Sequence, residues 1–120
     1  MIDPSNIASA YLELWNDPEE ASRRERLIDG WTVDASYVDP LMAGEGYEGI
    51  AAMISGAHAI FPGHTFSLRG TPDGHGRFVR FSWTLAPSDG ASAAAGTDIV
   101  RLDNSGRIAE VTGFLDGGTG

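Results

Sequence analysis

A change of hydrophobic period at Phe61-Pro62-Gly63 constrains the fold of this chain more than any other feature. Before this tripeptide, apolar residues recur every three or four positions, as they do in amphipathic helices. After it, apolar and polar residues alternate, as they do in half-buried strands. Because the helices precede a run of strands, the pattern predicts an α+β domain with helices on one face of an antiparallel sheet.

Three helices are expected before the switch, over residues 4–16, about 19–28 and about 49–60. Pro4 suits a first helical turn, and Asn16-Asp17-Pro18 ends the first helix. The apolar stripes of the first and third helices consist of Ile7, Tyr11, Leu14 and Trp15, and of Ile50, Met53, Ile54 and Ala57. Each stripe needs a partner surface, which a sheet provides.

Four strands are expected after the switch, within residues 64–70, 77–87, 92–103 and 107–116. The segments between them are rich in Gly, Pro, Asp and Ser, which is typical of hairpin turns. A shorter strand precedes Asp39-Pro40 and leads into a glycine-rich bend. Since a long twisted sheet curls, we expect a cone whose concave face is covered by three N-terminal helices.

A cone of this kind leaves a pocket between the sheet and the helices, which is a common place for a small hydrophobic molecule. The chain contains no internal repeat and no linker-like segment. We therefore expect a single domain over residues 1–120 with one ligand pocket inside it.

The charge of the chain excludes several classes of partner. Its 17 acidic and 8 basic residues give a net charge of −9, and such a surface repels nucleic-acid phosphates and anionic lipids. No apolar run is long enough to span a bilayer, and no cysteine is present for disulfides or thiolate chemistry. We expect a cytoplasmic protein that binds neither nucleic acid nor membrane.

Two side chains are more polar than their expected positions require. Asp98 shares a strand face with apolar neighbours and so points inward, where burial raises the pKa of a carboxyl group. Tyr11 lies on the inner stripe of the first helix, so its hydroxyl needs a partner. Together with Asp39 at a strand end, these groups form two donors and a base, a set that suits proton abstraction next to a carbonyl.

The order of elements, with "AYLELWN", "SYVDP", "GTDIVRLDNSGRIAEV" and a final "GFLD", resembles the NTF2-like superfamily with its cystatin-like cone. The closest resemblance is to the SnoaL-like and ketosteroid-isomerase-like branch, over nearly the whole chain. It implies that Asp39, in its Asp-Pro pair, is a general base and that Tyr11 and Asp98 donate to an oxyanion. It also implies a homodimer and no cofactor.

The pocket wall is expected to combine inner-face residues from both layers of the cone. These residues are Trp15, Met42, Met53, Ile54, Phe81, Trp83, Val111 and Gly113. Some ketosteroid isomerases carry a supporting tyrosine at the place of Ile54. The resemblance therefore implies fewer hydroxyl donors in this chain than in those enzymes.

Simpler interpretations of the same residues remain open at this stage. An Asp39-Pro40 pair is also typical of a turn, and a buried Asp98 also suits a purely structural bond to Tyr11 or to the backbone. The three histidines lack the spacing of a metal-binding pair, so no metal site is expected. Two functions fit: an acid/base isomerase or polyketide-cyclase-like enzyme acting on a hydrophobic enolisable carbonyl compound, or a non-catalytic hydrophobic-ligand binder or dimeric scaffold.

Overall fold

The computed structural model describes residues 3–116, and within that range it has three helices and one six-stranded sheet. The helices are α1 (Pro4–Asn16), α2 (Glu20–Gly30) and α3 (Gly46–Ile60). The strands are β1 (Trp31–Val38), β2 (Ala43–Glu45), β3 (His64–His75), β4 (Phe78–Pro87), β5 (Ala94–Leu102) and β6 (Ile108–Leu115). Their order across the sheet is β2-β1-β6-β5-β4-β3.

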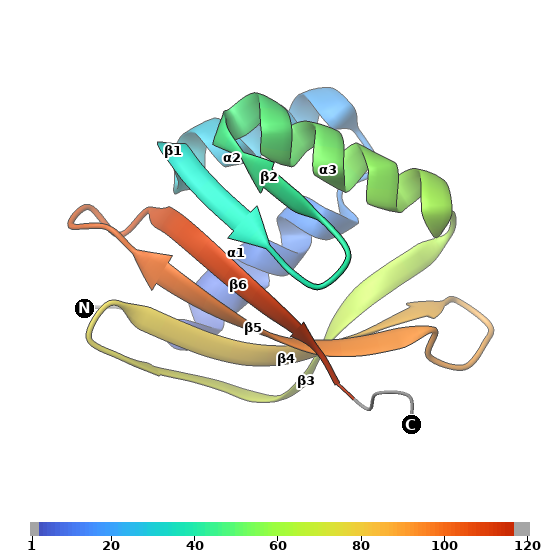
Figure 1. Cartoon of the computed structure of the whole chain (residues 1–120). Coiled ribbons are helices and arrows are strands. Elements are labelled where there is room, and N and C mark those ends of the chain that lie inside the picture. Colours follow the sequence, from blue (N-terminus) through green and yellow to red (C-terminus); the bar gives the residue numbers. More distant parts are fainter. Residues whose placement is uncertain (1–2, 117–120) are drawn as a thin grey trace.

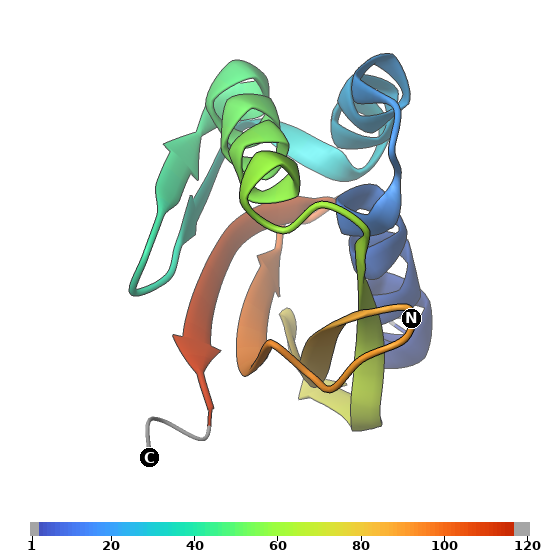
Figure 2. The ribbon, with the colours of Figure 1, turned by 90° about the vertical axis from the view of Figure 1, so that its right-hand side faces the viewer.

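The helices lie on one side of a curved, open sheet (Figure 1). α1 packs on β3 and β4, α3 packs on β1 and β2, and α2 packs on α3 and β1. The view turned by 90° shows α1 alongside β3, β1 and β2 beside α3, and β5 and β6 curving beneath α3 (Figure 2). The predicted α+β cone is confirmed. None of the helices within residues 3–116 has the length and apolar character needed to cross a membrane.

One strand pairing departs from the antiparallel sheet that we expected. β1 runs parallel to β6, with Tyr37 opposite Val111, whereas the other neighbouring strands are antiparallel. The long connection between β1 and β6 allows this direction, because parallel neighbours need a crossover and not a tight turn. As a result, the end of β1 that leads into Asp39 lies beside the middle of β6.

One short strand and one strand boundary also differ from the prediction. β2 is absent from the predicted elements because its three residues pair only with the end of β1. β3 continues to His75, through a segment predicted to be a turn. A register shift between Arg69 and Asp73 accommodates Pro72, and Gly70, with φ of +75°, supplies a backbone conformation that other residues rarely adopt.

The inward and outward faces of β4 and β5 follow the predicted alternation. On β5, Asp98 is 2% exposed and lies between buried Gly96 and Val100, while the neighbouring positions are partly exposed. On β4, the inward residues are Val79, Phe81, Trp83 and Leu85. These faces and the apolar stripes of the helices form one hydrophobic core. Within residues 3–116, Asp98 and Arg23 are the buried charged residues.

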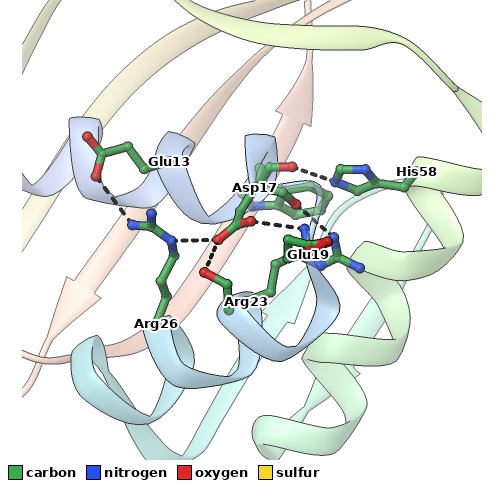
Figure 3. A network of polar contacts seen from close by, with 8 residues as sticks. Glu13, Asp17, Glu19, Arg23, Arg26 and His58 are labelled. Carbon is green, nitrogen blue, oxygen red and sulfur yellow. Dashed lines mark hydrogen bonds and ion pairs between the residues drawn. The ribbon is translucent and has the colours of Figure 1, made fainter.

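Asp17 organises the turn between α1 and α2 (Figure 3). Its carboxylate accepts hydrogen bonds from Ser22 Oγ and from Arg26 Nε. The bond from Ser22 is the largest influence that lowers the pKa of Asp17, to about 2. Buried Arg23 donates to the Asp17 carbonyl oxygen at 2.7 Å and to Ser55 Oγ on α3 at 3.0 Å. These bonds fix the start of α2 relative to α1 and α3.

Two further contacts fix the end of α1, where Trp15 faces the interior. The Asn16 side chain donates to the Phe66 carbonyl oxygen at 2.9 Å and accepts from the Phe66 amide at 2.8 Å, as a neighbouring strand would. His58 Nε2 on α3 donates to the Trp15 carbonyl oxygen at 2.7 Å, a contact also drawn in Figure 3. The Trp15 backbone is thereby held between β3 and α3.

Candidate active site

A cavity of about 300 Å³ opens between the helices and the concave face of the sheet. Its wall is largely apolar, and six aromatic side chains contribute to it: Tyr11, Trp15, Tyr37, Phe61, Phe66 and Trp83. Two carboxyl groups, those of Asp39 and Asp98, also line it. Within residues 3–116, no lysine, arginine or histidine side chain lines this cavity.

Tyr11 and Asp98 form the inner pair of the cavity. Tyr11 Oη donates to Asp98 Oδ2 at 2.6 Å, and both side chains are buried. The other carboxyl oxygen, Asp98 Oδ1, has no hydrogen-bond partner among the described residues. The inner pair joins α1 to the middle of β5, two elements far apart in sequence.

Burial dominates the ionisation of the inner pair. Desolvation raises the pKa of Asp98 from its ordinary value of 3.8 to about 6, against the opposing effects of Tyr11 and of the Trp83 indole as hydrogen-bond donors. The pKa of Tyr11 is raised well above 10, first by burial and then by the charge of Asp98. Asp98 therefore changes protonation state close to neutral pH, while Tyr11 remains a phenol.

Tyr37 and Asp39 form the outer pair. Tyr37 Oη donates to Asp39 Oδ2 at 2.6 Å. The second oxygen, Asp39 Oδ1, accepts from the backbone amides of Leu41 and Met42 at 2.7 and 2.9 Å. Asp39 thus combines the two positions that the sequence left open, because it stabilises the turn after β1 and also lies in the cavity wall.

The two pairs meet at Gly113 on β6. A Cβ atom added there would lie 2.9 Å from Asp98 Oδ1, 3.1 Å from Asp39 Cβ and 3.4 Å from Tyr37 Oη. Gly113 is also the partner of Asp98 in the β5–β6 ladder. The missing side chain at this position lets two acids and a phenol approach one another.

The aromatic rings of the wall support each other edge to face. The Phe66 ring lies 5.4 Å from Trp15 and 5.2 Å from Trp83, both in edge-on geometry. Gly96 makes room for Trp83, because a Cβ at Gly96 would collide with the indole. Such contacts hold large rings in fixed orientations, so the cavity has a well-defined aromatic wall.

The predicted pocket residues separate into three groups. Trp15, Met42 and Trp83 line the cavity. Ile54, Phe81 and Val111 are buried in the core and do not belong to the wall; Phe81 instead packs edge-on against Tyr11 at 5.0 Å. Met53 is partly buried against the core, and Gly113 lies under the two acids.

Tyr37 is the functional candidate that sequence reasoning missed. It lies two positions before Asp39 on a strand, and alternation places such residues on the same face. Its side chain is buried, and the centroid of its ring lies 5.7 Å from the centroid of the Trp15 ring. Burial is the largest influence that holds the pKa of its hydroxyl above 10, with the charges of Asp98 and Asp39 adding to it. Tyr37 therefore remains a hydrogen-bond donor.

Within residues 3–116, no group of three or more His, Asp or Glu side chains is placed to bind a metal ion. His58 is bonded to the Trp15 carbonyl oxygen, and His64 Nδ1 lies 3.0 Å from the Pro62 carbonyl oxygen. Arg80 and Arg101 are exposed on the outer face, paired with Asp73 and Glu110. The chemistry of the cavity thus comes from phenols, carboxyls and indoles.

Comparison with known proteins places this arrangement in a family. Residues 8–111 match the SnoaL-like domain. The chain belongs to the SnoaL-like family. A solved structure of a suggested isomerase of this family from Agrobacterium tumefaciens has 54% identity and a TM-score of 0.91, covering 93% of this chain and 96% of its own.

More distant structures share the fold of this SnoaL-like protein. A suggested SnoaL-like polyketide cyclase from Jannaschia has 18% identity and a TM-score of 0.70, covering 91% of this chain and 84% of its own. A cystatin-like protein of unknown function from Methylobium petroleophilum has 17% identity and a TM-score of 0.72, covering 99% and 81%. No curated protein matches the sequence.

Proposed function

We propose that this SnoaL-like protein is a cofactor-free acid/base enzyme, an isomerase or a cyclase, that acts on a small hydrophobic carbonyl compound with an enolisable C–H bond. The observation that carries the proposal is the buried Tyr11–Asp98 pair on the wall of an apolar cavity, with a second carboxylate, Asp39, on the same wall. The isomerase activity suggested for the Agrobacterium relative is consistent with this proposal.

In this proposal Asp39 takes the proton from the carbon next to the carbonyl. The C–H electrons form a C=C bond, and the carbonyl π electrons move to oxygen, giving an enolate with the proton on Asp39. Tyr11 and Asp98 donate to the enolate oxygen. For isomerisation, the compound carries a C=C bond conjugated with the enolate, and Asp39 returns the proton to the far carbon of that bond while the double bond shifts. For cyclisation, the enolate carbon attacks the carbon of a second carbonyl of the same molecule, the π electrons of that carbonyl move to its oxygen, and the proton on Asp39 neutralises the resulting alkoxide.

The protonation state of Asp98 decides whether donors are available. While Asp98 is ionised, it holds the single hydroxyl hydrogen of Tyr11. Once Asp98 is neutral, its own hydrogen can be donated and that of Tyr11 is released. An enolate placed beside Asp98 favours the neutral form, because two like charges repel. We expect an enolate-like ligand to bind with uptake of a proton at pH 7 to 8.

Tyr37 covers the oxygen that Asp39 needs for this reaction. Asp39 Oδ1 is occupied by two backbone amides, so Oδ2, which accepts from Tyr37, is the oxygen left to act as base. Because a carboxylate oxygen has two lone pairs, the second lone pair of Oδ2 can take the proton while Tyr37 keeps its hydrogen bond. The backbone amides on Oδ1 meanwhile keep the carboxylate oriented.

The test is solvent exchange of α-hydrogens on a panel of hydrophobic enolisable ketones, followed by NMR. Asp39→Asn removes the base and keeps the shape, so we expect exchange to slow about 10²–10⁴-fold on any ketone that wild type accepts, with affinity for a naphthol retained. Asp34→Asn, an exposed change of equal charge on β1, serves as the control. If wild type accelerates exchange on none of the ketones, the proposal is wrong.

A non-catalytic binding function is the second candidate. The turn at residues 39–42, in which Asp39 Oδ1 caps two amides, accounts for Asp39 without any chemistry. In that case the cavity carries a hydrophobic metabolite. We then expect Asp39→Asn to alter ligand affinity and stability together, with no exchange to lose.

We also propose a homodimer formed through the outer face of the sheet. Phe114 is 52% exposed there, and Thr97 lies opposite it in the ladder. Val38, 48% exposed, lies opposite Thr112 on the same face. Light scattering should give a dimer mass for wild type and a monomer mass for Phe114→Asp. A monomeric wild type contradicts this proposal.

A further inference from the structure

The cavity wall has negative charge and no positive charge to balance it. Asp39 and Asp98 both line the cavity, and no basic residue among those described lines it. Asp116, just beyond β6, adds to the raised pKa of Asp98, as does Asp39. The chain as a whole has a net charge of −9, which attracts cations and repels anions over longer distances. While Asp98 is ionised, an anionic ligand therefore meets repulsion here, and it binds only with uptake of a proton.

The two Tyr–Asp pairs present lone pairs to a ligand, and not hydrogens. Tyr11 and Tyr37 each have one hydroxyl hydrogen, and each gives it to a carboxylate at 2.6 Å. Their remaining capacity is that of acceptors. Asp98 Oδ1 is a further acceptor, buried and without a donor. Trp15, which also lines the cavity, has a buried indole Nε1 donor without a partner among the described residues. The acceptors of the two pairs outnumber this donor and favour a ligand rich in hydrogen-bond donors.

The aromatic wall suits the same kind of ligand. The indoles of Trp15 and Trp83 and the ring of Phe66 form one connected cluster at the cavity. Aromatic faces attract organic cations, most strongly where water is excluded. A flat ligand ring can also pack on these side chains as a hydrocarbon does.

We propose that this cavity binds small aromatic organic cations, with the ammonium group held by the Tyr11–Asp98 and Tyr37–Asp39 pairs and the ring against Trp15, Phe66 and Trp83. A primary ammonium carries three donors and a full positive charge, which match the acceptors and the charge of the pairs. This ligand class goes beyond the proposed function, since it requires no enolisable carbon and no catalysis.

Protons should be linked to this binding in the opposite sense from enolate binding. The titratable groups that face Asp98 are Tyr11 on α1, Tyr37 and Asp39 at the end of β1, and Asp116 after β6. A cation favours ionised Asp98, so it should bind more tightly as the pH rises through about 6. An enolate mimic should bind more weakly over the same range.

The experiment uses three probes of similar shape and different charge, benzylamine, benzyl alcohol and benzoate, titrated into the whole protein at pH 5 and pH 8 and followed by amide NMR shifts. At pH 8 we expect benzylamine to bind about tenfold more tightly than benzyl alcohol, and benzoate about tenfold more weakly. The affinity of benzylamine should fall several-fold at pH 5, and that of benzyl alcohol should stay constant. The amides of Gly96 and Gly113 should shift.

Asp98→Asn tests the assignment to the cavity. It should bring the affinity for benzylamine down to that for benzyl alcohol, whereas Asp34→Asn, with the same loss of charge on an exposed strand position, should leave it unchanged. Failure of benzylamine to bind, or equal affinity for all three probes, overturns the proposal. Equal effects of the two variants overturn it as well. None of these results bears on α-hydrogen exchange, so the proposed reaction is tested independently of the proposed ligand class.

Discussion

The inner and outer pairs contain the same two side chains at the same distance, yet their surroundings differ. In each, a tyrosine hydroxyl donates to one aspartate oxygen at 2.6 Å. The second oxygen of Asp39 accepts two backbone amides, while that of Asp98 accepts nothing. The outer carboxyl group thus accepts from Tyr37 and from two backbone amides, whereas the inner one is buried from water and one of its oxygens accepts no hydrogen bond.

The position of each aspartate in the sheet explains this difference. Asp39 follows the last residue of β1, where the chain turns and its amides are free to cap a carboxylate. Asp98 lies in the middle of β5 between β4 and β6, where the amides are used in the ladder. Residues of the same type therefore have different surroundings because of their positions. Asp39 accepts two backbone amides at a turn, and Asp98 is a buried acid whose pKa is raised to about 6.

The largest expected effect concerns Asp98→Asn. The carboxyl titrates near 3.8 when exposed and near 6 in the fold, so between these values the folded protein binds the extra proton, and stability falls as the pH rises. This group alone should lower the free energy of unfolding of wild type by about 2–3 kcal/mol between pH 4 and pH 8. Urea unfolding should show that loss in wild type and in the Asp34→Asn control, and not in Asp98→Asn. Parallel pH profiles for wild type and Asp98→Asn would contradict the assignment.

A smaller effect is expected where the two pairs meet. Gly113→Ala inserts a methyl group 2.9 Å from Asp98 Oδ1 and 3.1 Å from Asp39 Cβ, and overpacking of this kind costs about 2 kcal/mol. Gly56→Ala is the matched control, since a Cβ there meets nothing within 4 Å and should leave the helix as stable or slightly more so. Thermal unfolding of both variants measures the difference. Equal stability would mean that the pairs are not packed against Gly113.

The smallest effect compares the two phenols directly. Tyr11→Phe removes the 2.6 Å hydrogen bond to buried Asp98, whereas Tyr37→Phe leaves Asp39 with the amides of Leu41 and Met42. At pH 8 we expect Tyr11→Phe to be less stable than Tyr37→Phe by about 1 kcal/mol. The gap should close at pH 4, where Asp98 is neutral and needs its donor less. Denaturant titrations at the two pH values measure it, and a gap that is independent of pH would remove the distinction between the pairs.

Much of the fold could be predicted, because its elements carry strong local signals. α1 follows from Pro4 and a helical stripe, and its predicted bounds of 4–16 match the structure. Alternation gave the faces of β4 and β5, and with them the inward position of Asp98. β2 and the far end of β3 escaped prediction because their local composition is typical of turns and neither segment shows an alternation of buried apolar residues. They are strands only through hairpin pairing with β1 and with β4.

The candidate site was predictable in part for the same reason. Alternation tells which face a side chain occupies and not how deep it lies. Ile54, Phe81 and Val111 therefore point inward but are covered by other core residues. Tyr37 has the parity of Asp39, yet its bond to that carboxylate depends on the turn that orients Asp39. Contacts between residues on strands far apart in sequence, such as those around Gly113, can be predicted only when the register of the whole sheet is known.

The most direct test is an NMR titration of the Asp98 side-chain carboxyl carbon in wild type, assigned with Asp98→Asn. An acid whose burial outweighs the donors Tyr11 and Trp83 should titrate with a midpoint near pH 6. A midpoint near 3.8, the value of an exposed aspartate, would show that the inner carboxyl is not deprived of water and would contradict the distinction between the two pairs.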